Sequence, residues 1–512
     1  MTSDAVTNDA ATNDAATKPA PIDPIGSRPR AAFAAFLVLH AVLWTLLPTL
    51  LYANLPLDLI EALTYGREWQ LGYDKLPPLP WWLVEIMYRL FGTDAAYYAL
   101  AQLSVIVAFA AVWLTALPLV GPRRALIALL IIDGLHYFQF TAVKFNHDVI
   151  QLPLWGLAGY ALHAALRGGR LWHWVLLGLA VGLALWAKYF VAMLALPFGL
   201  FILLDPDARK ALARPGPWIA VLTALVVMAP HLVWLADNDF LPFAYADMRA
   251  APARGLFDHV LRPLVFIGGQ LVFMLPALLI AVPLVWPRPQ AAASAPRADA
   301  FDRRIVALLA FGPAASVMAL ATLSGRGTIA MWGYPLWLFL GLWIVLTAWT
   351  AIDATRLRRI VAAWAVVFSI FVAAFVVDYL VLPGFDHRYR AVLFPGDALA
   401  AEITQRFRAA TGRPLVYVIG SMWDGGNVAH YAPERPQPRV LIDGLSRRAP
   451  WIDLADLKAK GAAVVWTDGD PQVLPPAFAA VAPGAEVGKP FDLPFRRGGN
   501  VLHVGWAILR PQ

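Results

Sequence analysis

Long apolar runs follow one another through the first three quarters of the chain, and they constrain its fold more than any other feature. Most are close to the roughly 20 residues that a helix needs to cross a bilayer. Hydrophobic residues make up 60% of the 512 and charged residues 15%, which excludes an ordinary soluble globule. The runs contain Pro, Gly and Trp and lack the alternation of an outer-membrane barrel, so helices are expected. The predicted spans, about 11 in number, are residues 31–53, 95–119, 125–142, 149–166, 172–190, 191–204, 217–236, 264–286, 305–323, 335–352 and 360–382.

Arginine and lysine residues recur in alternate connections between these spans. The positive-inside rule places these connections in the cytoplasm: Arg28 and Arg30, Arg123 and Arg124, Arg167 and Arg170, Arg209, Lys210 and Arg214, Arg303 and Arg304, and Arg356, Arg358 and Arg359. The other connections and the C-terminus then face outward, which predicts a multi-pass protein of the inner membrane with an extracytoplasmic functional surface. The net charge of +7 is scattered over loops and not gathered on one face, so nucleic-acid binding is not expected.

Composition divides the chain into three parts. Residues 1–30 are rich in Ala, Thr and Asp and are predicted to be a disordered cytoplasmic tail. Residues 31–382 form the predicted transmembrane domain. Residues 383–512 have strand-length apolar runs at 415–420, 439–444 and 462–469 and an amphipathic stretch at 398–411, which predicts a small soluble α/β domain outside the membrane. Within it, residues 425–436 are predicted to be a solvated, turn-rich loop, with ligand contact as the alternative.

The outer segment after the first span, residues 54–93, has mixed polarity and is the first candidate for an active site. Asp58 and Glu61 lie about one helical turn apart, so their carboxylates can share a face of a short interfacial helix. One of them could act as a general base. The alternative is a capping box, in which Asp58 is the N-cap and Glu61 the N3 residue.

A second candidate is the outward segment 144–148. Asn146 and Asp148 are ordinary turn residues, which would explain them structurally. Lys144, His147 and Asp148 together also supply a phosphate clamp, a metal ligand and a second acid, so a functional role is favoured.

Two further cations are predicted near the outer face. Lys188 lies close to the outer end of its span, where it either neutralises an anionic ligand or extends to the interface. Arg326 lies between two glycines that allow backbone to approach a ligand, and its guanidinium suits bidentate phosphate binding; the alternative is an ordinary loop arginine. Together with Lys75, these cations suit a ligand with a lipid tail and an anionic head.

The outer segment resembles that of GT-C class membrane glycosyltransferases, specifically the family 39/83-like, dolichyl-phosphate-mannose-protein mannosyltransferase-like enzymes that use polyprenyl-phosphate sugars. The matching residues are Asp58 at the acidic position, Gly72 and Tyr73, Pro77, Pro78 and Leu79, Trp82 and Leu83, and Phe91 and Gly92. The likeness continues through residues 146–148, the Lys188 segment and the WGYP sequence near Trp332. Leu59 and Leu76 stand where the family has a second acid and a histidine.

The resemblance implies that a sugar is transferred from a polyprenyl-phosphate donor to a hydroxyl of a lipid, glycan or protein acceptor at the outer face of the membrane. Asp58 would be the general base of an inverting displacement, and Asp148 the second catalytic acid. Lys75, Lys144, Lys188 and Arg326 would bind the donor phosphate, with Glu61, Tyr73 and Asn146 in support. A divalent metal held by His147 and Asp148 is the one cofactor that the residues suggest. A donor of this kind needs no nucleotide-binding motif, and the sequence contains none.

Two other classes of function are alternatives. A lipid-linked sugar flippase would carry ionisable residues near mid-membrane, for which Asp133 and His136 are the candidates. A noncatalytic cell-envelope scaffold would use the C-terminal domain for binding and would not depend on Asp58.

Overall fold

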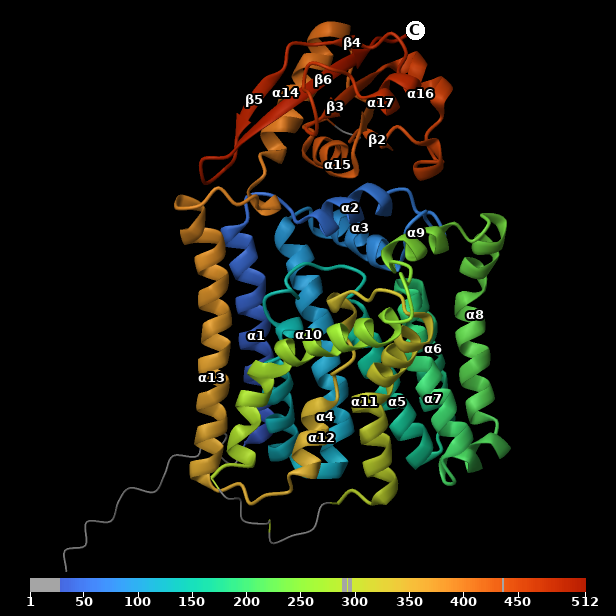
Figure 1. The fold of residues 1–512 in the computed structure, drawn as a ribbon, viewed down its shortest axis with the longest axis vertical. Helices are drawn as coiled ribbons and strands as arrows, with labels where there is room; N and C mark the ends of the chain where they lie inside the picture. Colours follow the sequence, from blue (N-terminus) through green and yellow to red (C-terminus); the bar gives the residue numbers. More distant parts are fainter. Residues whose placement is uncertain (1–27, 288–291, 293–296, 435–436) are drawn as a thin grey trace, which may run out of the picture.

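The structure is a computed structural model that describes residues 28–287, 292, 297–434 and 437–512. The predicted tail at residues 1–30 lies outside the described residues except for its last three, where helix α1 begins at Pro29. A bundle of long helices carries a separate C-terminal domain on one end, with short helices between the two (Figure 1). The predicted class, a polytopic helical membrane protein with a small α/β domain, is confirmed.

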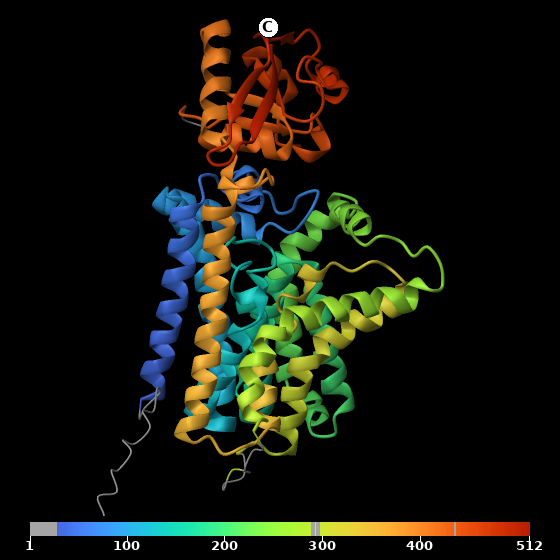
Figure 2. The same ribbon diagram turned by 60° about the vertical axis from the view of Figure 1, so that its left-hand side comes forward.

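The helices of the bundle differ widely in length. They are α1 (Pro29–Leu51), α2 (Leu57–Gly66), α3 (Leu79–Phe91), α4 (Asp94–Asp133), α5 (Gln151–Gly168), α6 (Leu171–Ala187), α7 (Ala192–Leu204), α8 (Gly216–Asp237), α9 (Leu241–Arg249), α10 (Asp258–Ala281), α11 (Ala300–Ser324), α12 (Leu340–Thr347) and α13 (Ala354–Val376). Among the described residues, six helical stretches are long and apolar enough to cross a membrane: Pro29–Leu51, Asp94–Asp133, Gly216–Asp237, Asp258–Leu284, Ala300–Ser324 and Ala354–Gly384. Two shorter apolar helices cover Leu171–Ala187 and Tyr189–Leu204. Figure 2 shows α1 and α13 side by side beneath the C-terminal domain.

The chain departs from the predicted spans around α4. This helix contains a break at Gly121, whose φ of 75° lies in the left-handed region, so it combines two helical segments. The predicted span 125–142 is wrong in its second half, because the helix ends at Asp133 and an irregular segment with the short helix η1 (His136–Phe138) follows. This segment runs to residue 150 and is largely buried among the helices, where protein groups can satisfy its backbone.

Asp133, one of the two residues that a flippase would use, is engaged in a buried polar contact between helices. Its Oδ1 lies 2.9 Å from His40 Nδ1, and its Oδ2 accepts a hydrogen bond of 2.7 Å from Trp364 Nε1. These residues come from α1, α4 and α13. Asp133 and His40 are 0% and 1% exposed, so the contact joins three helices in the protein interior and opens no path through it.

The C-terminal domain contains a mixed sheet in the order β2-β1-β3-β6-β4, with β5 paired to β6. Its strands are β1 (Tyr417–Gly420), β2 (Arg439–Ile442), β3 (Ala462–Trp466), β4 (Glu486–Val487), β5 (Phe491–Pro494) and β6 (Val501–Leu509), and its helices are α14 (Gly396–Thr411), α15 (Met422–Tyr431), α16 (Leu454–Lys460) and α17 (Pro476–Val481). The first three strands pair in parallel and β6 runs antiparallel to β3, with Val464 opposite Ala507. The three predicted strands and the predicted amphipathic helix are confirmed.

The prediction of a solvated loop at residues 425–436 is wrong for most of the segment that the structure describes. Helix α15 covers it as far as Tyr431 and packs against α2. Gly426 allows this approach, because a Cβ there would lie 2.6 Å from Ile60. Residues 435 and 436 lie outside the described part of the chain. The glycines that suggested a turn instead let the C-terminal domain pack on the helix that carries Asp58.

Candidate active site

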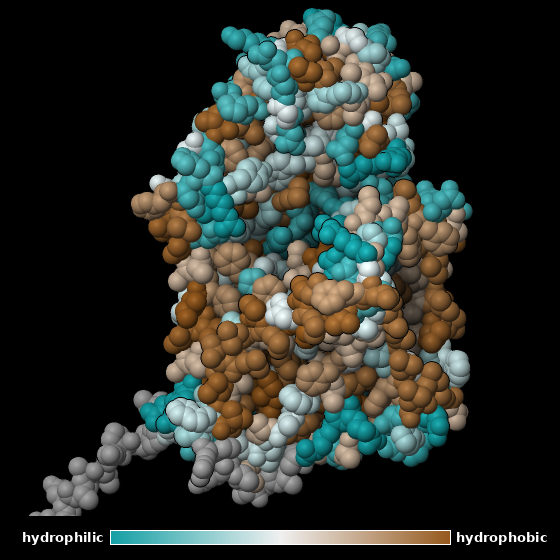
Figure 3. All heavy atoms as spheres, viewed as in Figure 1, coloured by the Kyte–Doolittle hydropathy of each residue, from teal (hydrophilic) through white to brown (hydrophobic). Residues whose placement is uncertain are grey.

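A cavity of about 560 Å³ opens among the short elements between the bundle and the C-terminal domain. Figure 3 shows hydrophilic residues in a hollow at this level, above a hydrophobic band of the helical bundle. One part of the cavity wall is charged, and another is apolar and aromatic. The predicted residues that line it are Asp58, Glu61, Lys75, Asn146, His147, Asp148, Lys188 and Arg326. Segments up to 268 residues apart in sequence thus contribute to one site.

Asp58 lies in the first turn of α2 and has two partners from the irregular segment after α4. Its Oδ2 lies 3.0 Å from Lys144 Nζ and accepts a hydrogen bond of 2.9 Å from Asn146 Nδ2. Burial alone would raise the pKa of Asp58, but the ammonium of Lys144 and the hydrogen bonds outweigh it, so the pKa lies below its usual value. No hydrogen bond from the described residues reaches Oδ1, which leaves that oxygen of the ionised carboxylate available.

The capping-box alternative does not describe α2. The N-cap of this helix is Pro56, and no side chain caps it. Glu61 instead forms an ion pair with Lys75, at 2.5 Å between Oε2 and Nζ. Burial would lower the pKa of Lys75, but the carboxylate of Glu61 raises it above the usual value, so the lysine stays charged.

Residues 146–148 combine structural and site contacts. Asn146 Oδ1 accepts from the backbone N–H groups of Asp148 and Val149, each at 3.0 Å, which is the turn role expected of asparagine. Its amide reaches Asp58, as described above. Asp148 Oδ1 pairs with Lys188 Nζ at 2.6 Å, and both side chains are largely buried, at 9% and 15% exposed. Lys188 is therefore held at the cavity by a carboxylate and does not extend to the membrane interface.

The predicted metal ligands are engaged with protein groups. His147 donates a hydrogen bond from Nε2 to the carbonyl of Pro77 at 3.1 Å, and burial lowers its pKa to about 3. Asp148 is paired with Lys188. Across the residues that the structure describes, no three His, Asp or Glu side chains come together in a group that could hold a metal ion. His147 and Asp148 thus bind a backbone carbonyl and an ammonium, and they do not form part of a three-residue ligand group within the described chain.

Of the two predicted residues Arg326 and Tyr73, only Arg326 lines the cavity. Arg326 lines the cavity and pairs with Asp247, at 2.5 Å between Nη1 and Oδ1. Tyr73 does not line the cavity; its hydroxyl donates to the carbonyl of Tyr65 at 2.7 Å, and its ring is buried beside those of Tyr65 and Trp81. Tyr73 thus supports the loop that carries Lys75 and does not contact a ligand in the cavity.

The two departures from the family motif differ in position. Leu59 is fully buried and does not line the cavity, so an acid there would be placed away from it. Leu76 lines the cavity beside Lys75 and presents an apolar side chain where the family has an imidazole.

The sequence interpretation missed Tyr245 and Arg249, which reach the cavity from α9. Lys75 Nζ lies 5.4 Å from the ring centre of Tyr245, within the range of a cation–π contact. Arg249 ends the same helix and lines the cavity wall. The sequence signal for these residues was that segment 237–263 connects two spans on the outer side. The spacing of its residues does not show that it folds back against Lys75.

A bundle of membrane-length helices that carries a small soluble domain at one end is the GT-C fold. A solved structure shares this fold over 94% of this chain and 98% of its own, with a TM-score of 0.63 and 15% identity: ArnT from Cupriavidus metallidurans bound to undecaprenyl phosphate. Mycobacterial arabinofuranosyltransferase AftD matches 94% of this chain and 40% of its own, with a TM-score of 0.51 and 14% identity.

Sequence comparisons point to the same class. The family model described as dolichyl-phosphate-mannose-protein mannosyltransferase matches residues 75–234. Lipopolysaccharide core galacturonosyltransferase RgtA of Rhizobium johnstonii is 27% identical over 94% of this chain and 96% of its own. Lipid A galacturonosyltransferase RgtD of the same organism is 30% identical over 34% of this chain and 37% of its own. The predicted resemblance to GT-C class glycosyltransferases is confirmed, and the comparisons support glycosyl transfer as the activity.

Proposed function

We propose that the protein transfers a sugar from a polyprenyl-phosphate donor to an acceptor hydroxyl, with Asp58 as the general base and inversion at the anomeric carbon. The observation that carries this proposal is the state of Asp58: an ionised carboxylate at the cavity, with Oδ2 bound by Lys144 and Asn146 and Oδ1 without a donor from the described residues. Oδ1 can accept the proton of the acceptor hydroxyl while the oxygen of that hydroxyl attacks the anomeric carbon.

The leaving group is a polyprenyl phosphate, and its developing negative charge needs fixed positive charge nearby. Lys75, Lys188 and Arg326 line the same cavity as Asp58, and each is held by a carboxylate. Asp148 would serve by orienting Lys188 toward the phosphate. The apolar part of the wall, with Phe190, Met193 and other side chains, suits the first isoprenoid units of the donor.

The names of the relatives support a specific proposal for the sugar and the acceptor. Similarity to RgtA extends over 94% of this chain, which supports galacturonic acid as the sugar and a lipopolysaccharide core or lipid A sugar as the acceptor. An anionic sugar suits a cavity whose wall includes four cations, Lys75, Lys188, Arg249 and Arg326, against three carboxylates, Asp58, Glu61 and Asp148. We place the protein in the inner membrane, with the cavity and the C-terminal domain on the extracytoplasmic side, in accord with the positive-inside pattern.

The test is sugar transfer in membranes that carry wild-type protein or Asp58→Asn at matched expression. Radiolabelled polyprenyl-phosphate galacturonic acid, mannose and arabinose serve as donors, and lipid A and lipopolysaccharide core serve as acceptors. Wild-type transfer should be greatest with the galacturonosyl donor and should fall by about 10²–10⁴-fold in Asp58→Asn, the range for loss of a general base. Equal transfer by both proteins would eliminate Asp58 as the base, and no transfer with any donor would refute the proposed function.

A further inference from the structure

Arg448 of the C-terminal domain reaches the elements that carry the cavity residues. It ends the short helix η9 (Ser446–Arg448), and its Nε donates to Asp74 Oδ2 at 2.9 Å. Its Nη2 donates to the hydroxyl of Tyr65 at 3.2 Å, and Tyr65 in turn donates to Asp74 Oδ1 at 2.8 Å. Asp443 pairs with the remaining guanidinium nitrogen. Arg448, Tyr65 and Asp74 therefore form a closed network between the two parts of the molecule.

Aromatic side chains continue this contact toward the cavity. Trp451 packs edge-on against Tyr65 and Tyr73, with ring centres 5.9 and 5.7 Å apart. Tyr65 stacks on Trp81 at 4.4 Å, and Trp81, which lines the cavity, meets His147 edge-on at 4.8 Å. Packed rings thus connect the C-terminal domain to the cavity wall without a gap.

The network fixes both partners of the Glu61–Lys75 ion pair. Tyr65 follows Glu61 by one turn of α2, so the two side chains lie on the same face of that helix. Asp74 precedes Lys75 in a segment, residues 69–78, that contains no helix or strand to hold its backbone. Tyr65 of α2 already donates to Asp74 directly, and Arg448, by binding both residues at once, reinforces this link between the backbone of Lys75 and the helix that carries Asp58 and Glu61.

We propose that Arg448 is a positioning residue for sugar transfer, which acts through Asp74 to hold Lys75 at the cavity. This inference rests on the proposed function, in which Lys75 stabilises the leaving phosphate. It gives the C-terminal domain a part in the active site that its position outside the cavity would not indicate.

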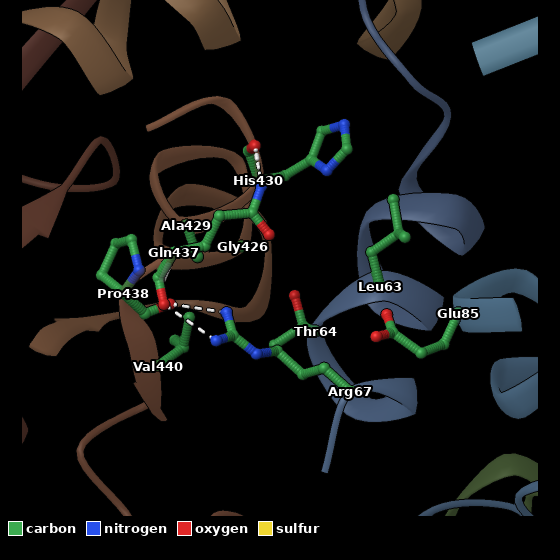
Figure 4. A pocket seen from close by; sticks show the side chains of 10 residues that line it. All are labelled: Leu63, Thr64, Arg67, Glu85, Gly426, Ala429, His430, Gln437, Pro438 and Val440. Atoms are coloured by element: carbon green, nitrogen blue, oxygen red, sulfur yellow. Dashed lines mark hydrogen bonds between the residues drawn. The ribbon is translucent and has the colours of Figure 1, made fainter. Parts of the chain in front are cut away.

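The same interface offers a matched control. Arg439 pairs with Glu68 at 2.5 Å. Beside this pair, Arg67 donates to the carbonyls of Gln437 and Pro438 at 2.8 and 3.0 Å, as Figure 4 shows. These contacts join the C-terminal domain to the end of α2, as the Arg448 network does. Glu68 and Arg439 do not line the cavity and have no contact with Asp74. Arg439→Gln therefore removes a contact of the same kind from the same interface without releasing Lys75.

The first experiment measures kcat and KM for the donor in the full-length protein, with thermal unfolding as a check on folding. Arg448→Gln and Asp74→Asn should each lower kcat by about tenfold or more, the loss expected for a hydrogen bond to a charged group. The double variant should fall no further, since both changes break one network. Arg448→Lys should recover part of the loss, and Arg439→Gln should stay within about twofold of wild type. Additive losses in the double variant, or equal losses in Arg448→Gln and Arg439→Gln, would overturn the proposal.

A second experiment does not depend on transfer. The chain has no cysteine, so Leu76→Cys introduces a unique thiol. Leu76 is half-buried and lines the cavity beside Lys75. Its rate of reaction with a soluble maleimide reports how often the segment opens. Adding Arg448→Gln should raise this rate by about tenfold, and adding Arg439→Gln should leave it unchanged. An unchanged rate with Arg448→Gln refutes the positioning role even if wild type transfers sugar, whereas a raised rate without transfer by wild type would refute only the proposed function.

Discussion

Lys144 is expected to set the lower pH limit of activity through Asp58. At the observed 3.0 Å, the attraction between an ammonium and a carboxylate is about 1.4 kcal/mol in water and about 5.5 kcal/mol at an effective dielectric constant of 20. The side chains of Lys144 and Asp58 are 35% and 33% exposed, so solvent screens the pair and the lower part of this range applies. Since 1.36 kcal/mol corresponds to one pKa unit, Lys144→Gln should raise the pKa of Asp58 by about 1–2 units.

The sign follows from the role of the base. Asp58 must be deprotonated to act, and Lys144 keeps its pKa below the usual value, so wild-type activity should persist into mildly acidic solution. In Lys144→Gln the acidic limb of kcat/KM against pH should move upward by about 1–2 pH units. The assay is initial transfer rate across pH in detergent micelles. Lys210→Gln is the control, because Lys210 is 77% exposed and pairs with Asp207, a carboxylate that also binds Arg304 and does not line the cavity.

An acidic limb that stays at the same pH in Lys144→Gln would refute this reasoning. It would mean either that Asp58 is not the titrating base or that its ionisation does not depend on Lys144. A shift toward lower pH would contradict the electrostatics outright, because loss of a nearby cation cannot stabilise a carboxylate.

Three further predictions concern other parts of the molecule. Lys188→Met should raise KM for the sugar donor and lower kcat by about tenfold. It removes an ammonium that can donate hydrogen bonds to the phosphate, and it leaves Asp148 buried without its partner. Steady-state kinetics with short-chain sugar donors will show this. A metal chelator should leave transfer unchanged, because His147 and Asp148 are bound to protein groups; loss of activity that added Mg²⁺ or Mn²⁺ restores would contradict this. Burial raises the pKa of Asp424 in the C-terminal domain from its usual 3.8 to about 6, so between these two pH values the folded state binds a proton that the unfolded state has released. Stability should therefore fall as pH rises between these two values, with a total change of about 3 kcal/mol, and Asp424→Asn should remove this slope in thermal unfolding scans.

The class of fold could be predicted because bilayer thickness imposes a length on apolar helices and so leaves a direct record in sequence. The helix ends were harder where polar and turn residues interrupt apolar runs. Residues 134–142 continue an apolar pattern, yet the helix ends at Asp133. The irregular segment that follows can be apolar because neighbouring helices bury it. Gly425 and Gly426 suggested a turn by composition, but their lack of a side chain lets α15 pack closely against Val440 of β2 at Gly425 and against Ile60 of α2 at Gly426.

The site shows a similar division. That Asp58, Asp148, Lys75 and Lys188 lie at one end of the bundle could be predicted, because a charge beside a membrane span is costly without a function or partner. The sequence did not predict which carboxylate pairs with which lysine, because each pair joins separate elements. Asp58 pairs with Lys144, and Asp148 pairs with Lys188. Tyr245 was missed for the same reason, because only the tertiary fold brings α9 over Lys75.

These ion pairs also bear on how a phosphate could be bound without disrupting the site. An ammonium has three donors, and in the described structure Lys75 and Lys188 each give one to a carboxylate. Donors therefore remain for a phosphate while both pairs stay intact, so the lysines need not move as charge develops on the leaving group. Fixed cations of this kind stabilise a transition state without reorganisation at the moment of reaction, which is how a protein can favour departure of a lipid phosphate with its own side chains. It follows that Glu61→Gln, which removes the carboxylate that holds Lys75 in place and raises its pKa, should lower kcat more than it raises KM for the donor.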